Sequence, residues 1–391
     1  MTPLYALVII LCIIGAAELI AEKSKARLSM FFLTGLFALL LSWGGLPKDI
    51  WYTSNLVTMG ATLVGFILTT MGTVMDRDEL LEQWKTVIIG FGVVVCIVIL
   101  IIGVAPLIID RNFAFGAAPV VAGGAVAQII MGGIFQEKGL ADAEAFCLLI
   151  LTLQSLVGVP ITSLILRKEA KRYIESGEYK NSIKDEIAVT YEGKKERKTL
   201  IPPLPKAYQK PAVLLAKTGL VTALGYYISG LTGGKLNALL LCLVFGIIGK
   251  QIGFLEKGGL SQANSFSIIN YSVIALIFAN AGQITPQMVA SMISPLLVVF
   301  VLGLIAISIG GFVMAKLLKM NPMMGIAIGL TALYGMPATF LIPEEVANAV
   351  GENDEQVAAL KSYMLPKLLT AGFATVSIAS VVIVGFVTNM I

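Results

Sequence analysis

The sequence contains no histidine, and only 13% of its 391 residues are charged. Its 4 cysteines lie far apart inside apolar runs, without the close Cys–Cys or Cys–His spacing of a zinc site. The apolar segments also lack a nucleophile elbow, a phosphate-binding loop and a zinc-protease motif. These absences argue against an enzyme, a structural metal centre and a histidine proton relay, and we expect no cofactor beyond a coupling ion.

Hydrophobic residues make up 57% of the chain. Apolar stretches of about 20 residues recur along most of its length, and each is long enough to cross a lipid bilayer as a helix. The net charge of +4 comes mainly from residues 167–198, a pattern that suits a cytoplasmic loop better than a nucleic-acid surface. We therefore predict an all-α polytopic membrane protein of the cell (inner or plasma) membrane, with no nucleic-acid partner.

Three pairs of segments align at nearly one spacing, which indicates an internal repeat. The aligned pairs, with the offset obtained by subtraction, are Gly72 and Gly282 (210), Asn112 and Asn321 (209), and Gly35 and Gly246 (211). Chance similarity is the alternative, because glycine is common in membrane helices. We predict two homologous halves, residues 1–166 and 211–391, joined by a basic cytoplasmic linker, residues 167–210.

Each half offers six apolar stretches, of which the fifth is interrupted. In the first half they lie near residues 3–21, 29–44, 54–75, 85–109, 114–135 and 143–166. The fifth contains the adjacent Gly123 and Gly124, and its counterpart is broken at Gly335 and Pro337. Broken backbone is tolerated at membrane depth where it lines a cavity or is buried in protein. We predict re-entrant hairpins at about residues 114–136 and 321–342.

The charge distribution favours hairpins over full crossings. If the linker is cytoplasmic and the first hairpin is re-entrant, the cluster of Lys23, Lys25 and Arg27 is also cytoplasmic, whereas a sixth crossing would leave it outside. Residues 1–21 lack a basic region before them and a clear cleavage site, so we expect them to be retained as the first span. The predicted fold is an inverted repeat of 5+5 transmembrane helices with two re-entrant hairpins, and both termini are extracellular or periplasmic.

Paired broken segments mark the solute site of inverted-repeat transporters, because the ends of half-helices present unpaired backbone groups near the midplane. The predicted substrate-binding residues are Gly123, Gly124 and Gln128 in hairpin 1 and Tyr334, Gly335, Pro337 and Thr339 in hairpin 2. Glycine lets backbone approach a solute, and amide, hydroxyl and freed carbonyl groups supply hydrogen bonds. Glycine-mediated helix packing and a proline kink without ligand are the alternatives.

Hydroxyl and amide oxygens near the ends of two repeat-related spans favour a sodium site. The predicted ion-binding residues are Thr69, Thr70, Thr73, Asn280 and Gln283. Hard oxygen ligands suit Na⁺, and helix-end capping is the alternative. Few ionisable groups lie inside the predicted spans, which disfavours proton coupling. A proton-coupled carrier or exporter would need Glu144 or Glu345 in its cavity.

This layout of two inverted five-span halves, hairpins near residues 116–128 and 325–340, and a basic loop resembles the elevator-type sodium-coupled secondary transporters of the glutamate:sodium symporter and 2-hydroxycarboxylate (citrate) symporter groups. The similarity is one of layout and covers most of the chain. It implies Na⁺-coupled symport of a small organic anion or amino acid, in which a transport domain carrying both hairpins slides against a scaffold domain that forms a homodimer. A channel or membrane scaffold without alternating access is the alternative from another class.

Overall fold

All regular secondary structure that the chain shows is helical, with no strand among the described residues. The computed structural model describes residues 1–391 except 25–27, 75–82, 181–199, 203, 234–235, 237, 280, 336–337, 376–379, 389 and 391. Residues 181–199, in the middle of the predicted basic linker, therefore lie outside the described residues. Helices satisfy their own backbone hydrogen bonds, which is what long apolar segments in lipid require. The all-α prediction is confirmed.

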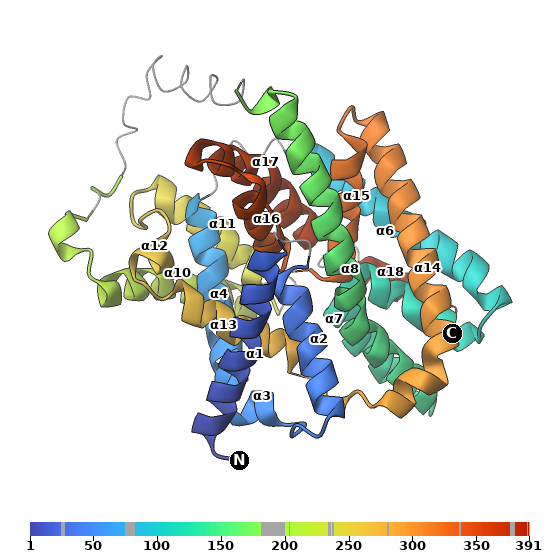
Figure 1. Ribbon diagram of the computed structural model, residues 1–391. Helices are drawn as coiled ribbons and strands as arrows, with labels where there is room; N and C mark the ends of the chain where they lie inside the picture. The colour runs from blue at the N-terminus through green and yellow to red at the C-terminus, as the bar shows by residue number, and fades with distance from the viewer. Residues whose placement is uncertain are drawn as a thin grey trace. The chain divides into compact units, whose positions relative to one another are not determined.

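The chain packs as two compact units, and each unit takes residues from both halves of the sequence (Figure 1). Unit 1 consists of Met1–Cys12, Asp49–Glu82 and Ser182–Ala279. Unit 2 consists of Ile13–Lys48, Gln83–Asn181 and Asn280–Ile391. The compact units and the predicted sequence halves are thus different divisions of the same chain.

Unit 1 is organised around one central helix, α4. Its helices are the first part of α1 (Pro3–Lys23), α3 (Ile50–Thr53), α4 (Leu56–Val74), α10 (Pro211–Leu231), α11 (Ala238–Gln251), α12 (Gly259–Gln262) and α13 (Phe266–Phe278). A Cβ on Gly72 of α4 would lie 2.9 Å from the Cα of Gly246 in α11. A Cβ on Gly60 would lie 2.6 Å from the carbonyl carbon of Ser272 in α13. These glycines let α4 meet both neighbours backbone to backbone, as small residues do in membrane bundles.

Unit 2 contains the remaining helices. They are the second part of α1, α2 (Met30–Trp43), α6 (Trp84–Val104), α7 (Arg111–Glu137), α8 (Ala141–Glu175), α14 (Pro286–Leu317), α15 (Pro322–Leu330), α16 (Ala338–Val350), α17 (Asp354–Phe373) and α18 (Ser380–Thr388). Helix α14 runs beside α6, and α16 runs beside α17 (Figure 1). Gly311 of α14 meets α15 closely, because a Cβ there would lie 2.7 Å from the Cα of Ile326.

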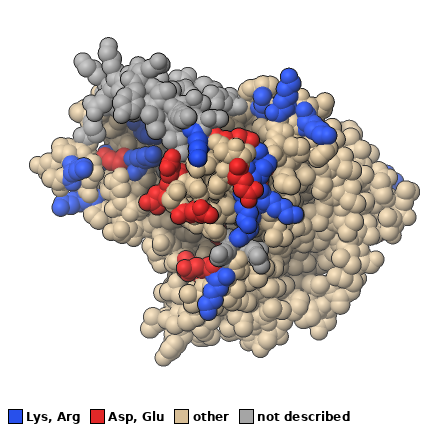
Figure 2. Space-filling view, turned by 45° about the horizontal axis from the view of Figure 1, so that its top comes forward, with Lys and Arg blue, Asp and Glu red and all other residues tan. Residues whose placement is uncertain are grey.

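Six of the described helices are long and apolar enough to cross a membrane. They are Pro3–Lys23, Leu56–Thr73, Trp84–Leu107, Ala141–Glu175, Pro211–Leu231 and Pro286–Leu317. Helices α6 and α14 also expose large apolar side chains, among them Ile99 at 66% and Leu297 at 56%. Figure 2 shows charged side chains gathered on one part of a face whose remaining surface is largely uncharged. A protein with such surfaces is embedded in a membrane.

The order of helices recurs along the chain. Helices α1 and α10 both have 21 residues, α2 and α11 both have 14, and α3 and α12 both have 4. Each short helix is followed by an asparagine in the left-handed region, Asn55 with φ 64° and Asn264 with φ 52°. Few non-glycine residues adopt that conformation, so its recurrence at an offset of 209 residues (264 minus 55) is consistent with the repeat predicted from the sequence.

Candidate functional site

The first predicted hairpin falls on α7, which reverses direction in its middle. Asp110 caps its start by accepting a hydrogen bond from Asn112 N at 2.8 Å. Gly124 leaves helical geometry, with φ 63° and ψ −141°, a conformation that strongly favours glycine. A Cβ on Gly116 would lie 2.6 Å from Cε2 of Phe135, although residues 116 and 135 of a straight helix would be about 28 Å apart. Helix α7 is therefore two antiparallel arms joined at Gly124.

The second predicted hairpin falls on α15 and α16, with a break between them. Asn321 caps α15 by accepting a hydrogen bond from Met323 N at 2.8 Å. After α15 the chain forms a single 3-10 turn, η4 (Thr331–Leu333), and reaches Gly335 with φ 58°. The two positive-φ glycines, Gly124 and Gly335, are 211 residues apart by subtraction. Pro337 lies outside the described residues.

The structure places every described residue of the predicted solute site in unit 2. Gly123, Gly124, Gly335 and Thr339 are buried, and Gln128 and Tyr334 are half-buried. Helix α7 contacts η4, so the first hairpin packs against the turn that leads into the second break. Thr339 also packs on α17, because a Cβ on Gly372 of that helix would lie 2.7 Å from Thr339 Cγ2. The two broken segments are thus neighbours within one compact unit.

Helix α8 supplies residues to this region that the sequence analysis did not single out. A Cβ on Gly158 would lie 2.7 Å from Leu333 Cβ and 3.3 Å from Tyr334 Cδ1, so α8 touches the second break directly. Gln154 and Thr162 stand one turn before and one turn after Gly158, and only 2% and 0% of their surfaces are exposed. A recurrence of polar and small residues every fourth position in an apolar helix is the signal that could have found them.

The predicted ion-binding residues are divided between the units. In unit 1, Thr69 Oγ1 lies 2.8 Å from Thr222 Oγ1, and Thr73 Oγ1 donates to Thr70 O at 2.6 Å and accepts from Gly258 N at 2.9 Å. Unit 2 holds an exposed Gln283 in η3 (Ala281–Gln283), and Asn280 lies outside the described residues. The sodium site formed by these five residues stays a prediction. The part of the chain that the structure describes has no cluster of three His, Cys, Asp or Glu side chains that could hold a metal ion.

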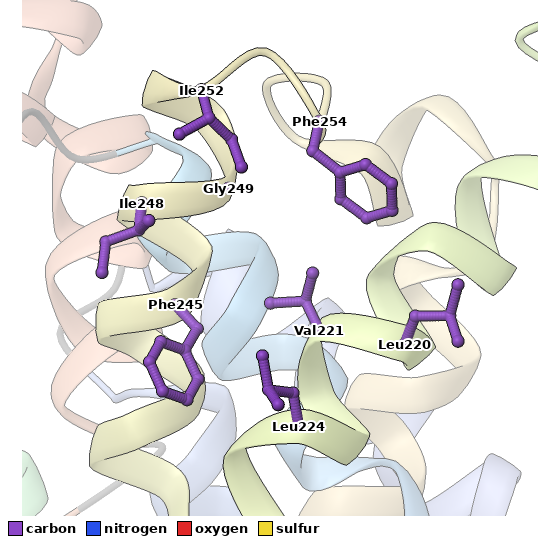
Figure 3. A pocket seen from close by; sticks show the side chains of 8 residues that line it. All are labelled: Leu220, Val221, Leu224, Phe245, Ile248, Gly249, Ile252 and Phe254. Atoms are coloured by element: carbon purple, nitrogen blue, oxygen red, sulfur yellow. The ribbon is translucent and has the colours of Figure 1, made fainter. Parts of the chain in front are cut away.

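An apolar pocket lies in unit 1, between α10, α11 and the segment that follows α11 (Figure 3). It has a volume of about 260 Å³ and is lined by Leu220, Val221, Leu224, Phe245, Ile248, Gly249, Ile252 and Phe254. Solute sites combine apolar walls with a few polar groups that fix orientation, and none of these side chains is polar. The pocket is therefore a poor candidate for the solute site.

The neutral polar groups around the two breaks are backbone groups, the amides of Gln128 and Gln154, and the hydroxyls of Thr162, Tyr334 and Thr339. Glu144 lies near Gln128, because a Cβ on Gly132 would lie 3.3 Å from Gln128 Nε2 and 3.8 Å from Glu144 Cγ. The neutral groups can hydrogen-bond a small polar molecule or coordinate a monovalent cation, but they include no nucleophile beside a base. No family model and no curated protein matches this chain.

Proposed function

We propose that this chain is a secondary active transporter that couples uptake of a small organic anion or amino acid to Na⁺. The observation that carries the proposal is the pair of positive-φ glycines, Gly124 and Gly335, which interrupt helices at repeat-related positions within one compact unit. Interrupted helices in corresponding positions of two halves are a pointer to a transporter binding site, because they bring unpaired backbone groups to a solute.

The composition of the two units supports an elevator mechanism. Unit 2 holds the fourth, fifth and sixth stretches of both halves, including both broken segments. Unit 1 holds the third stretch of both halves, together with α10 and α11. In an elevator transporter the broken segments belong to a domain that moves as one body against a scaffold. We assign unit 2 as the transport domain and unit 1 as the scaffold, through which we expect a homodimer to form.

The repeat supports an inverted topology. The reversal of α7 at Gly124 favours a hairpin that enters and leaves on one face, and this leaves five crossings in each half. An odd number of crossings puts the second half in the membrane upside down relative to the first. Ten crossings and two re-entrant hairpins with both termini outside follow from that count, as the resemblance to the glutamate:sodium and 2-hydroxycarboxylate symporter groups implies.

Uptake into proteoliposomes tests the function. Purified protein is reconstituted and offered labelled amino acids and organic acids under an inward Na⁺ gradient, an inward proton gradient, or neither. We expect saturable uptake that follows the Na⁺ gradient and exchanges with labelled solute in counterflow. Uptake that ignores Na⁺ and follows the proton gradient would refute the coupling, and flux without saturation or counterflow would favour a channel.

Proton coupling is the second candidate, and the position of Glu345 favours it. The carboxylate of Glu345 in α16 accepts hydrogen bonds from Ser29 Oγ at 2.7 Å and Met30 N at 3.0 Å, at the start of α2. A carboxylate inside the transport unit could carry a proton. If it serves only to cap α2, Glu345→Gln will leave the rate and ion dependence of uptake within about twofold of wild type, whereas a proton carrier would lose coupling.

A further inference from the structure

The apolar pocket of unit 1 is a groove between one face of α10 and one face of α11 (Figure 3). Leu220, Val221 and Leu224 share a face of α10, and the lining residues of α11 recur at three- and four-residue spacing. Three of the lining side chains reach the protein surface: Leu220 is 65% exposed, Leu224 48% and Ile248 44%. The groove is therefore open at an apolar surface, which in a membrane-embedded protein is where lipid chains lie.

One end of the groove carries a charged side chain. Lys217 lies one turn before Leu220 on α10, and its Nζ is 5.3 Å from the centroid of the Phe254 ring, which lines the groove. In Figure 3, Phe254 lies at one end of the groove and Leu224 at the other. The Lys217 end is the one nearer the start of α10, which follows the basic linker and is cytoplasmic in the predicted topology.

Lysines outnumber acids around that end. Residues 204–222 and 248–262 contain a single acidic residue, Glu256, and it forms an ion pair with Lys217. The lysines of these two segments are Lys206, Lys210, Lys217, Lys250 and Lys257. Lys206, Lys210 and Lys257 are exposed and form no salt bridge with another described residue. An anionic group is therefore favoured at this end of the groove.

The length of the groove fits one leaflet of a bilayer. Lys210 caps α10, and Leu224 lies 14 residues further along (224 minus 210), which is about 21 Å of helix. The headgroups of one leaflet lie about 20–22 Å from the midplane, half of the full thickness of about 40–45 Å. A phosphate beside Lys210 would thus place an acyl chain against Leu220 and Leu224.

The same features disfavour other occupants of the groove. A water-soluble solute would find no polar side chain among the lining residues. A second copy of the chain, related by a twofold axis along the membrane normal, would bring the lysine-rich ends of the two α10 helices together. Like charges that face each other across an interface are unfavourable, so the groove suits a lipid better than a second copy.

We propose that this groove binds an anionic phospholipid of the cytoplasmic leaflet, with one acyl chain between α10 and α11 and the phosphate beside Lys210. The lipid site goes beyond the proposed transport function, because it requires only that unit 1 lies in a membrane in the predicted orientation. A lipid that binds the folded protein in this way stabilises it by mass action.

Lipid titrations of the purified full-length protein in detergent, followed by native mass spectrometry, test the proposal. The probes are dioleoylphosphatidylglycerol, which is anionic, and dioleoylphosphatidylcholine, which has the same chains and no net charge. Leu224→Trp and Leu220→Trp fill the groove from partly exposed positions, and Lys210→Gln removes a charge at its end. The matched controls are Leu297→Trp, at a position of α14 that is 56% exposed and outside the groove, and Lys138→Gln, at an exposed lysine of unit 2.

We expect wild type to bind phosphatidylglycerol at least about fivefold more tightly than phosphatidylcholine. Lys210→Gln should weaken phosphatidylglycerol binding about fivefold and leave phosphatidylcholine binding unchanged, because one lysine near the membrane surface contributes about that factor. Each tryptophan variant in the groove should weaken binding of both lipids more than about tenfold, as exclusion of two methylene groups would. Phosphatidylglycerol should raise the melting temperature of wild type and of both controls, but not that of the groove variants.

The proposal is overturned if wild type binds the two lipids equally, if both groove variants bind phosphatidylglycerol as wild type does, or if Leu297→Trp loses as much affinity. If one groove variant does not fold, the other decides. Loss of a dimer in the groove variants with unchanged lipid binding would also overturn the proposal and would assign the groove to contact between copies. The titrations use no ion gradient, so failure of lipid binding and failure of Na⁺-driven uptake are separate results.

Discussion

Glu169 shows how this protein keeps a charge inside a packed bundle. Its side chain has no exposed surface, and Arg172 donates to both carboxylate oxygens, at 3.0 and 2.7 Å. Tyr363 of α17 donates to the same carboxylate at 2.8 Å, and its ring stacks on Tyr173 of α8. The carboxylate therefore joins α8 to α17 within unit 2. A buried charge is tolerated only with such complete pairing.

The two acidic partners of Arg172 differ in burial, which makes them a matched pair for mutation. Glu169→Gln should lower the free energy of unfolding by about 2–4 kcal/mol, because it weakens a buried, doubly hydrogen-bonded ion pair and the bond from Tyr363. Glu178, whose side chain is 50% exposed, also bonds Arg172 at 2.7 Å, but Glu178→Gln should cost less than about 1 kcal/mol. Thermal unfolding in detergent measures both, and equal losses would contradict the burial argument.

The contribution of the exposed Arg172–Glu178 ion pair to stability depends on pH. The hydrogen bond from Arg172 holds the pKa of Glu178 below its ordinary value. The stability that this pair adds is therefore present at neutral pH and is lost as the pH falls through the lowered pKa. Because Glu178 is half-exposed, solvent screening keeps that contribution small.

The glycines at the breaks could be found from the sequence directly, whereas the four-residue spacing of Gln154, Gly158 and Thr162 marks a face of α8 without showing what that face contacts. Adjacent Gly123 and Gly124 in an apolar run are locally unusual, and the non-helical residue proves to be Gly124. The role of Gln154 depends on which face of α8 meets the second break, and tertiary packing decides that. Thr70 is predicted from the sequence as an ion ligand, and its hydroxyl lacks a hydrogen-bond partner in the described structure. It belongs to unit 1, however, whereas both breaks belong to unit 2.

At the scale of helices, the backbone conformation at Gly124 disfavours any residue larger than glycine. Gly124→Ala should cost about 1–3 kcal/mol, because an L-residue is strained at φ 63° and ψ −141°. We expect Na⁺-driven uptake to fall more than tenfold while the protein still folds. Gly133→Ala is the control: Gly133 is helical with open space around it, so alanine there should be neutral or stabilising by up to about 1 kcal/mol. Normal uptake by Gly124→Ala would remove hairpin 1 from the site.

Helix positions follow closely from hydrophobic length, but helix ends do not. All six apolar stretches of the first half fall on helices, since an apolar run must satisfy its backbone internally. Helices α2 and α11 have only 14 residues, about 21 Å, and are shorter than the spans expected there. Helix α8 instead continues past residue 166 to Glu175, carrying Glu169 and Arg172 with it. Helix ends are determined by capping and packing, which cannot be inferred from composition.

At the scale of the whole molecule, the predicted repeat and the compact units carry different information. Similarity between segments predicts which elements correspond, and the matching lengths of α1 and α10 agree with that prediction. It does not reveal which elements pack together, because each unit draws on both halves. Which helices belong to one compact unit depends on contacts between side chains that are far apart in the sequence. Thr69 and Thr222, which are 153 residues apart, make such a contact.

The side of the membrane on which Lys23 lies decides whether hairpin 1 is re-entrant. Single cysteines replace Lys23, Lys138 or Lys168 in a chain whose Cys12, Cys96, Cys147 and Cys242 are changed to alanine, and a membrane-impermeant maleimide is added to intact or permeabilised cells. With five crossings per half, Lys23→Cys and Lys168→Cys should react only after permeabilisation, and Lys138→Cys should react in intact cells. If the first hairpin crossed fully, one more span would separate Lys23 from Lys168, and Lys23→Cys would react in intact cells. That result would end the inverted-repeat topology and, with it, the elevator mechanism.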